Sequence, residues 1–303
     1  MADHAWLRGL FPPIPTAFDA TGGLLAPPPG WLPFLAHAGV DGVVALGSNG
    51  EAMQLTETER QTWIRAVKRA LPDSLHLIVG TGADSTRATI ERTKAAADEG
   101  AEAALVVTPF YYRKQLTAEA LRGHYAAVAE ASPIPILIYN IPPHTGYDLG
   151  TDWIVTIALE SEIAGIKESS GDLSRLPELR ARLGPDFVLL TGSGEKFLDA
   201  LELGADGSIA ALANLAPATM VAIQEAFSEP DLEEGSRLQR RIAPLGEALS
   251  RSYGVPGMKA GVRLLGYDHG EPRAPLPGLT GGEVSSLRSL LHDAQLLPHA
   301  IAT

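Results

Sequence analysis

Short apolar runs alternate with amphipathic segments along most of the chain. The runs are apolar almost throughout instead of alternating with polar residues, which is typical of parallel strands covered on both faces. The first run contains three prolines and can form only an edge or rim strand. We expect eight strands, at residues 11–18, 40–47, 75–82, 103–109, 134–140, 163–167, 187–192 and 207–212.

The segments between these runs have the spacing of helices. The clearest begins with a capping box, Thr56-Glu57-Thr58-Glu59, which is followed by apolar residues at helical intervals. A strand followed by a helix, repeated eight times, predicts an α/β protein with a (β/α)₈ barrel, the TIM barrel. We expect helices at residues 30–38, 56–71, 85–100, 117–131, 152–159, 172–182, 195–203 and 217–227.

The last quarter of the chain is too long for a tail. Residues 232–297 predict two or three further helices packed on the barrel. We therefore expect a barrel at residues 1–228 and C-terminal helices at 229–303, within one structural unit. No linker, low-complexity run or second domain is recognisable.

Composition narrows the classes of function. The chain has 303 residues, with 24 Lys and Arg against 36 Asp and Glu, which gives a net charge of −12. An acidic balance of this size argues against nucleic acid as a partner. There is no cysteine, so disulfides, thiolate catalysis and cysteine-held metal centres are excluded. The eight histidines are scattered, and we expect no protein-bound metal.

The sequence gives no sign of export, a membrane span or a nucleotide cofactor. The first six residues lack the basic and apolar regions of a signal peptide, and we expect a cytoplasmic protein. Residues 207–224 are uncharged, but a strand followed by a helix explains them better than a membrane span. Residues 80–85, Gly-Thr-Gly-Ala-Asp-Ser, lack the third glycine of a dinucleotide-binding turn. We expect no cofactor and no membrane.

Polar residues at the ends of the predicted strands are the candidates for chemistry, because (β/α)₈ barrels build their active sites there. Lys167 ends an apolar strand, where an amine is costly unless it reaches the rim, pairs, or gives up its proton. A desolvated amine is a nucleophile for carbonyl carbon, as in a Schiff-base lysine. The alternative is a solvated ammonium. The residues expected to meet Lys167 in the mouth of the barrel are Ser48, Asn49, Tyr111 and Tyr139.

Two of these positions have a specific interpretation and a plain one. The turn Gly47-Ser48-Asn49-Gly50-Glu51 offers N–H groups and a hydroxyl to a carboxylate. It is equally well an ordinary turn in which Asn49 is left-handed and Glu51 favours the next helix. Tyr139 could relay protons beside the lysine, or could be a half-buried phenol bonded to a carbonyl. His144, just beyond it, could face the distal end of a substrate or be an exposed loop residue.

Taken together, these motifs resemble the dihydrodipicolinate synthase / N-acetylneuraminate lyase family of class I aldolases. The resemblance implies a Schiff-base role for Lys167, proton relay by Tyr139, and a pyruvate-carboxylate site at Gly47, Ser48 and Asn49. It implies that Tyr111 completes the site of a neighbouring chain, and hence a homotetramer built as a dimer of dimers. It also implies that Ile209, in Gly207-Ser208-Ile209-Ala210, lines the pyruvate pocket. Ser169 is expected to contact a substrate hydroxyl or only to shape its turn.

The choice of substrate depends on position 144. The resemblance implies that the synthases usually carry an arginine there and two threonines where this chain has Ser48-Asn49. We therefore expect a lyase that acts on pyruvate and 2-keto acids, with 4-hydroxy-2-oxoglutarate or a 2-keto-3-deoxy sugar acid as substrate. Two alternatives remain. One is 4-hydroxy-tetrahydrodipicolinate synthase, which condenses pyruvate with aspartate semialdehyde. The other is a non-catalytic keto-acid-binding barrel.

Overall fold

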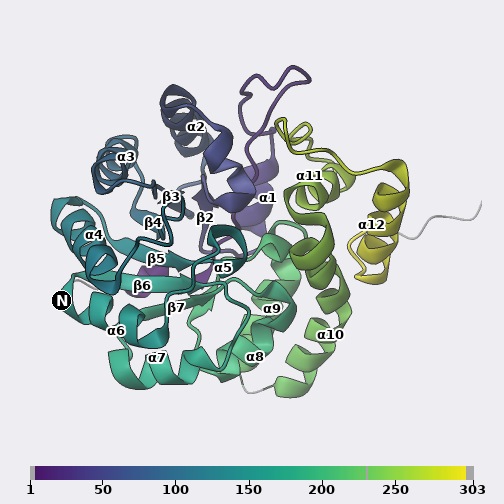
Figure 1. Cartoon of the computed structure of the whole chain (residues 1–303). Helices are drawn as coiled ribbons and strands as arrows, with labels where there is room; N and C mark the ends of the chain where they lie inside the picture. The colour runs from purple at the N-terminus through teal and green to yellow at the C-terminus, as the bar shows by residue number, and fades with distance from the viewer. Residues whose placement is uncertain (1–3, 230, 298–303) are drawn as a thin grey trace, which may run out of the picture.

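The apolar runs form a barrel of parallel strands with helices around it (Figure 1). The computed structural model describes residues 4–229 and 231–297. Within them, eight strands follow one another in the order β1-β8-β7-β6-β5-β4-β3-β2. The strands are β1 (Gly9–Leu10), β2 (Gly42–Ala45), β3 (His76–Gly80), β4 (Ala103–Val107), β5 (Ile136–Asn140), β6 (Ile163–Glu168), β7 (Val188–Thr191) and β8 (Gly207–Ser208). The predicted TIM barrel is confirmed.

Apart from the short α5, which was not predicted, the described helices of the barrel agree with the predicted positions to within a few residues. The capping box is present, with Thr56 and Glu59 each accepting the other's backbone N–H at the start of α2. Figure 1 shows α5 over the centre of the ring and the other helices outside it. The helices of the barrel, α5 included, are α1 (Trp31–His37), α2 (Glu57–Ala70), α3 (Thr86–Asp98), α4 (Ala118–Ala131), α5 (Pro142–Thr145), α6 (Thr151–Glu160), α7 (Arg175–Leu183), α8 (Phe197–Glu202) and α9 (Pro217–Ser228).

The first predicted strand is misplaced. Residues 11–18 do not form a continuous ladder, because Pro12, Pro13 and Pro15 have no N–H to donate. The ladder strand is instead the preceding pair, β1, next to β8. The segment after it still closes the barrel. Pro13 forms an isolated parallel β-bridge with Val44 of β2, and the Ile14 N–H donates to the Val44 carbonyl at 2.9 Å.

The last predicted strand is shorter than expected. Residues 207–212 pair with β7 only over β8, and the chain then turns into the 3₁₀ segment η5 (Ala211–Asn214). The remaining short 3₁₀ segments are η1 (Ala5–Leu7), η2 (Ser48–Gly50), η3 (Ala52–Gln54) and η4 (Gly194–Lys196). Of these, η2 and η3 follow β2 and contribute to the site described below.

The C-terminal part packs against the barrel through α10 (Leu232–Ala248), the π-helical segment η6 (Leu249–Tyr253), α11 (Gly254–Leu264) and α12 (Gly281–Asp293). The predicted two or three helices are therefore three, with residues 230 and 298–303 outside the described residues. Apolar residues of α10 to α12 share one buried cluster with α1, α2 and the outer faces of β2 and β3. In this way α11 is fixed close to the carboxyl end of β2.

A second buried cluster fills the inside of the barrel. It combines residues from most of the strands, and its members include Tyr139 and Ile209. On β5, the strand of Tyr139, the residues Ile136 and Ile138 point outward into the cluster under α4 and α6. Both faces of the strand are therefore buried, which explains its continuous apolar sequence. Among the described residues, no helix is both long and apolar enough to cross a membrane. The signal-peptide prediction concerns a segment whose residues 1–3 are outside the description.

Candidate active site

Lys167 and Tyr139 lie side by side at the carboxyl ends of β6 and β5. The ladder between these strands pairs the two residues directly. Both are buried, with exposed fractions of 3% for Lys167 and 4% for Tyr139. The Nζ atom of Lys167 lies 4.1 Å from the centroid of the Tyr139 ring. No acidic side chain of residues 4–229 and 231–297 forms an ion pair with it. The ammonium thus has an aromatic face as its neighbour in place of a carboxylate.

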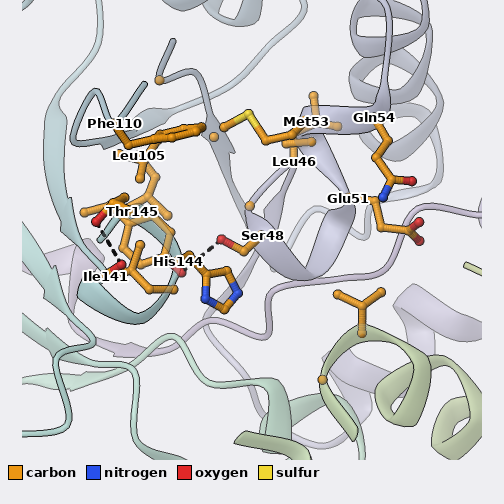
Figure 2. A pocket seen from close by; sticks show the side chains of 18 of the residues that line it. Leu46, Ser48, Glu51, Met53, Gln54, Leu105, Phe110, Ile141, His144 and Thr145 are labelled. Atoms are coloured by element: carbon orange, nitrogen blue, oxygen red, sulfur yellow. Dashed lines mark hydrogen bonds between the residues drawn. The ribbon is translucent and has the colours of Figure 1, made fainter. Parts of the chain in front are cut away.

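Ser48 connects the turn after β2 to this pair. Its Oγ lies 3.4 Å from the phenol oxygen of Tyr139, at the long end of a hydrogen bond (Figure 2). The contact joins residues 91 positions apart in the sequence. Three of the five residues expected to converge therefore form a chain of contacts in space, in which Ser48 contacts Tyr139 and Tyr139 contacts Lys167.

The turn itself is shaped differently from the ordinary turn considered above. Its left-handed residue is Glu51, with φ of 54°, while Asn49 is not left-handed. Glu51 does not cap the following helix either, because Thr56 and Glu59 do so. In the described residues the N–H groups of Ser48 and Asn49 have no hydrogen-bond acceptor, whereas those of Gly50 and Glu51 bond back to the turn. Two free donors and one hydroxyl suit a carboxylate.

Ile209 and Ser169 flank the pair on the side of β7 and β8. Ile209 is 1% exposed and belongs to the cluster inside the barrel. The Ser169 hydroxyl is buried without a hydrogen-bond partner among the described residues, while the Ser169 N–H donates to the carbonyl of Asn140 at 2.9 Å. The hydroxyl lies close against Gly192, where a Cβ would be 2.0 Å from it. A buried free hydroxyl is an available contact for a substrate.

Tyr111 is not part of this constellation within one chain. It lies in the loop after β4 with an exposed fraction of 74%, next to Tyr112 at 65%. The two rings contact each other edge to face, with centroids 5.0 Å apart. The loop is held by Asp84, whose carboxylate accepts the N–H groups of Phe110 and Tyr111 at 2.8 Å each. The loop backbone is therefore held by hydrogen bonds while the Tyr111 side chain is largely exposed.

His144 lies on α5 at the mouth of a cavity of about 520 Å³. The cavity wall also contains Gly47, Ser48 and Tyr139, together with residues of η3, the strand ends and the start of α11 (Figure 2). The residue is exposed on one side. Protein atoms around the imidazole still disfavour its charged form and lower the pKa of His144, and the nearby Lys167 cation lowers it further. His144 therefore presents a neutral ring to the cavity near pH 7.

A larger cavity of about 760 Å³ lies at the opposite end of the barrel, around the starts of β5, β6 and β7. The smaller cavity is the better candidate site, because it opens at the carboxyl ends of the strands and contains the Ser48 and Tyr139 side chains. No group of three or more His, Cys, Asp or Glu side chains in the described part of the chain could hold a metal ion.

Two buried polar arrangements next to the site have no signature in the sequence. Asn140 donates to Glu168 at 2.9 Å and to Asp148 at 3.0 Å, which ties together the residues that directly follow Tyr139 and Lys167. Burial raises the pKa of Glu168 despite these bonds. Glu51 forms an ion pair with Lys259, 208 positions away in the sequence. Only their adjacency to recognised motifs, and not any local pattern, could have drawn attention to them.

The described strands form a parallel eight-stranded barrel, with a cavity and a lysine–tyrosine pair at their carboxyl ends. This arrangement is that of a (β/α)₈-barrel enzyme. The chain belongs to the dihydrodipicolinate synthetase family, whose model matches residues 7–294. The resemblance seen in the sequence is thereby confirmed, and the protein is an enzyme of the aldolase and lyase class.

Relatives of two activities are similar to this chain. A probable mitochondrial 4-hydroxy-2-oxoglutarate aldolase of Emericella nidulans is 36% identical over 86% of each chain. A 4-hydroxy-tetrahydrodipicolinate synthase of Exiguobacterium sp. is 35% identical over 84% of this chain and 86% of the relative. Among solved structures, the dihydrodipicolinate synthase of Acinetobacter baumannii in complex with pyruvate has a TM-score of 0.88 at 34% identity. The match covers 96% of this chain and 99% of that one.

The electrostatic influence of Lys167 on His144 can be measured by NMR titration of the histidine ring protons. We expect the pKa of His144 to lie below the ordinary value of 6.5 in the wild-type protein. Lys167→Ala removes the cation and should raise that pKa only part of the way, because the crowding around the ring is the larger cause. His124, whose pKa burial alone lowers to about 4, should not change and serves as the internal control. A His144 pKa at the ordinary value of 6.5, in the wild type or in Lys167→Ala, would contradict the lowering by burial.

Proposed function

We propose that this protein is a Schiff-base-forming lyase that acts on pyruvate and 2-keto acids, with Lys167 as the nucleophile. The observation that carries the proposal is a buried lysine side chain packed on Tyr139 with no acidic partner in the described residues. A similar synthase from Acinetobacter baumannii was solved with pyruvate, which supports a keto acid as the ligand. The barrel fold alone would not carry this proposal, since one fold hosts many chemistries.

In the proposed reaction the neutral amine of Lys167 attacks C2 of the keto acid. The carbinolamine loses water to give a protonated Schiff base, which withdraws electrons from C3. With 4-hydroxy-2-oxoglutarate, removal of the proton on the C4 hydroxyl breaks the C3–C4 bond. Glyoxylate leaves, and an enamine remains on the lysine. Protonation at C3 and hydrolysis then release pyruvate and restore the amine.

Tyr139 is proposed to move the protons of these steps. The Lys167 amine lies over its ring, 4.1 Å from the centroid, and its phenol oxygen lies 3.4 Å from the Ser48 hydroxyl. We propose that a substrate bound beside the lysine exchanges protons with this phenol. Ser48 Oγ and the free N–H groups of Ser48 and Asn49 are proposed to bind the substrate carboxylate, with Gly47 allowing close approach of the backbone. Ile209 is proposed to cover the pyruvate methyl group, and Ser169 to bind a substrate hydroxyl.

Borohydride trapping tests the covalent step. In the presence of pyruvate, we expect mass spectrometry to find a reduced adduct on Lys167. Lys167→Ala should abolish the label, because no other amine of the described residues is placed beside Tyr139. Tyr139→Phe should slow labelling and turnover by roughly 10²-fold, the usual contribution of a positioned acid or base.

Lys94→Ala is the matched control for these variants, because it removes an exposed lysine on α3. It should be labelled like the wild type. Circular dichroism establishes that each variant is folded. A label on another lysine, or none in the wild type, would contradict the mechanism and the role of Lys167 as its nucleophile.

Assembly is the next prediction, and it rests on the exposure of Tyr111. An ordered loop that presents two adjacent tyrosines to solvent is a feature of interfaces. We propose that Tyr111 completes the site of a second copy in a homotetramer built as a dimer of dimers. Sedimentation velocity should then find an oligomer, and Tyr111→Phe should keep the oligomer while lowering kcat. A wild-type monomer with full activity on dilution would contradict the proposal.

Substrate choice is proposed from His144. An arginine would give a distal carboxylate a permanent charge and a bidentate fork. His144 has a lowered pKa and offers one hydrogen bond from a neutral ring. The substrate we propose is therefore 4-hydroxy-2-oxoglutarate or a related 2-keto-3-deoxy sugar acid, held at its distal end by His144 and Asn49. The relative named as a 4-hydroxy-2-oxoglutarate aldolase supports the first of these.

The two reactions are compared through their kcat/KM values. We expect cleavage of 4-hydroxy-2-oxoglutarate, or of the sugar acid, to exceed condensation of pyruvate with aspartate semialdehyde. The cleavage assay follows pyruvate release, and the condensation assay follows loss of the aldehyde. The proposal is falsified if condensation is faster by about tenfold, a difference of about 1.4 kcal/mol in transition-state stabilisation. The synthase reading, supported by the Exiguobacterium relative, would then stand.

A further inference from the structure

The turn that carries Ser48 and Asn49 is bounded on both sides by residues in an unfavourable backbone conformation. Leu46 has φ of 56° and Glu51 has φ of 54°, and neither is glycine. Each such residue costs roughly 1–3 kcal/mol and persists only where the surroundings hold it. Leu46 is 1% exposed, and its carbonyl approaches β3 so closely that a Cβ on Gly80 would be 2.0 Å from it. Packing against β3 therefore holds the first end of the turn.

The other end is held by side-chain contacts to the C-terminal part of the chain. The Glu51 carboxylate pairs with the Lys259 ammonium of α11 at 2.6 Å and accepts the backbone N–H of Arg273 at 2.7 Å. Both charged side chains are inaccessible, at 0% for Glu51 and 1% for Lys259. Lys259 also donates to the carbonyl of Glu271 at 3.0 Å and lies 4.4 Å from the centroid of the Phe18 ring.

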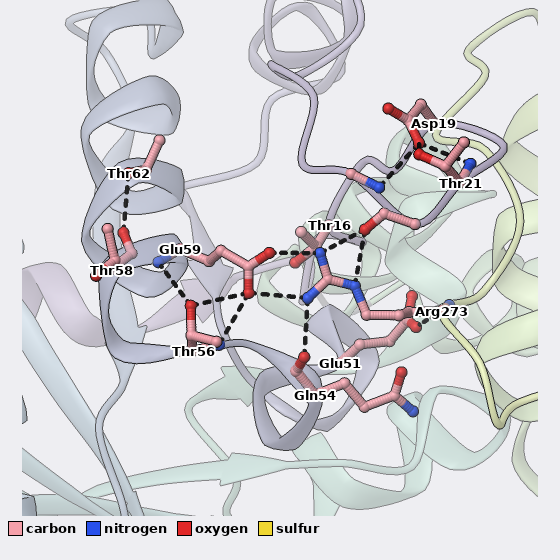
Figure 3. A network of polar contacts seen from close by, with 12 residues as sticks. Thr16, Asp19, Thr21, Glu51, Gln54, Thr56, Thr58, Glu59, Thr62 and Arg273 are labelled. Atoms are coloured by element: carbon pink, nitrogen blue, oxygen red, sulfur yellow. Dashed lines mark hydrogen bonds and ion pairs between the residues drawn. The ribbon is translucent and has the colours of Figure 1, made fainter.

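Arg273 strengthens the same connection around the segment that follows the turn (Figure 3). Its guanidinium donates to both carboxylate oxygens of Glu59 at 2.7 and 2.9 Å and to the carbonyl of Gln54 at 2.9 Å. It also donates to the carbonyl of Gly22 at 2.6 and 3.0 Å. The arginine lowers the pKa of Glu59 to about 2, as expected for a charged bidentate pair. The chain from Glu51 to Glu59 is thus attached to the C-terminal loop at several points.

A contribution to stability alone does not account for the buried Glu51–Lys259 ion pair. Removing two charges from water costs several kcal/mol per ion, so a buried pair often adds no net stability compared with apolar side chains. What such a pair does supply is a fixed separation and direction between two elements. Here the elements are the turn and α11, whose first residues, Gly254, Val255 and Pro256, line the same cavity as Ser48.

We propose that the Glu51–Lys259 ion pair is a positioning device that keeps the N–H groups and hydroxyl of the turn aimed at the substrate carboxylate. This inference rests on the proposed function of the turn. Lys259 and Glu51 touch no substrate atom and act through Ser48 and Asn49. The C-terminal helices are therefore part of the active site in function, although they contribute no reacting group.

The experiment measures how borohydride trapping of the intact protein depends on pyruvate concentration. The variants are Glu51→Gln, Lys259→Met and the double variant. Each single substitution leaves one buried charge without its partner, so a loss of thermal stability is expected. The double substitution removes both charges and should recover much of that stability. It cannot recover the tie, because methionine has no N–H to offer the glutamine.

We expect the pyruvate concentration for half-maximal trapping to rise about tenfold in all three variants, a difference of about 1.4 kcal/mol. The amount trapped at saturation should stay at the wild-type level, since Lys167 and Tyr139 belong to β6 and β5. A merely structural role would lower the stability and leave this concentration unchanged. In the double variant the two effects separate, because stability recovers while apparent affinity does not.

Arg180→Met is the matched control. Arg180 forms an ion pair with Asp206 at 2.6 Å at the opposite end of the barrel, with both side chains largely buried. It should lose stability but keep the wild-type pyruvate dependence. Trapping in the double variant with wild-type half-saturation would overturn the inference while leaving the lyase proposal intact. No trapping in the wild type would instead overturn the lyase proposal, so the two failures are distinguishable.

Discussion

The site depends on one constraint, a lysine side chain buried at a strand end with no counter-ion among the residues that the structure describes. The register of β5 against β6 makes this possible, because it sets Lys167 opposite Tyr139 and turns both side chains into the barrel. A shift of one residue would turn Lys167 outward under the helices. Asn140 and Glu168 occupy those outward positions and are hydrogen-bonded to each other. The same ladder therefore places the Lys167–Tyr139 pair inside the barrel and the hydrogen-bonded Asn140–Glu168 pair, which links the two strands, outside it.

The second half of the site is a turn whose shape is imposed from outside. Its residues alone would not keep Leu46 and Glu51 left-handed, since both have side chains that disfavour this region. One end is fixed by β3, and the other is bound to α11 and the loop before α12 by Glu51 contacts. The C-terminal helices thus complete the mouth of the barrel as well as covering apolar surface. This is why a site at the end of β2 involves residues near position 260.

What could be predicted from the sequence is what depends on local pattern. Continuous apolar runs located seven of the strands, the Thr56–Glu59 capping box located α2, and the strand ends identified Lys167 and Tyr139. The first strand was misplaced because apolar character outweighed the missing N–H groups of the prolines. The Glu51–Lys259 pair was missed because it forms only when distant elements pack. In the ordinary-turn interpretation Asn49 would be left-handed by propensity, whereas tertiary contacts select Glu51 instead.

The charges in the cavity also bear on what the site accepts. Burial lowers the pKa of His144, and the nearby Lys167 cation lowers it further. Glu51 is among the residues around the cavity, but its carboxylate is buried and paired with Lys259. The nearby free groups of the turn are donors, at Ser48 and Asn49. A substrate that brings its own carboxylate would satisfy these donors. In the proposed mechanism the same carboxylate also stabilises the cationic Schiff base on Lys167, which would favour a 2-keto acid over a neutral carbonyl compound.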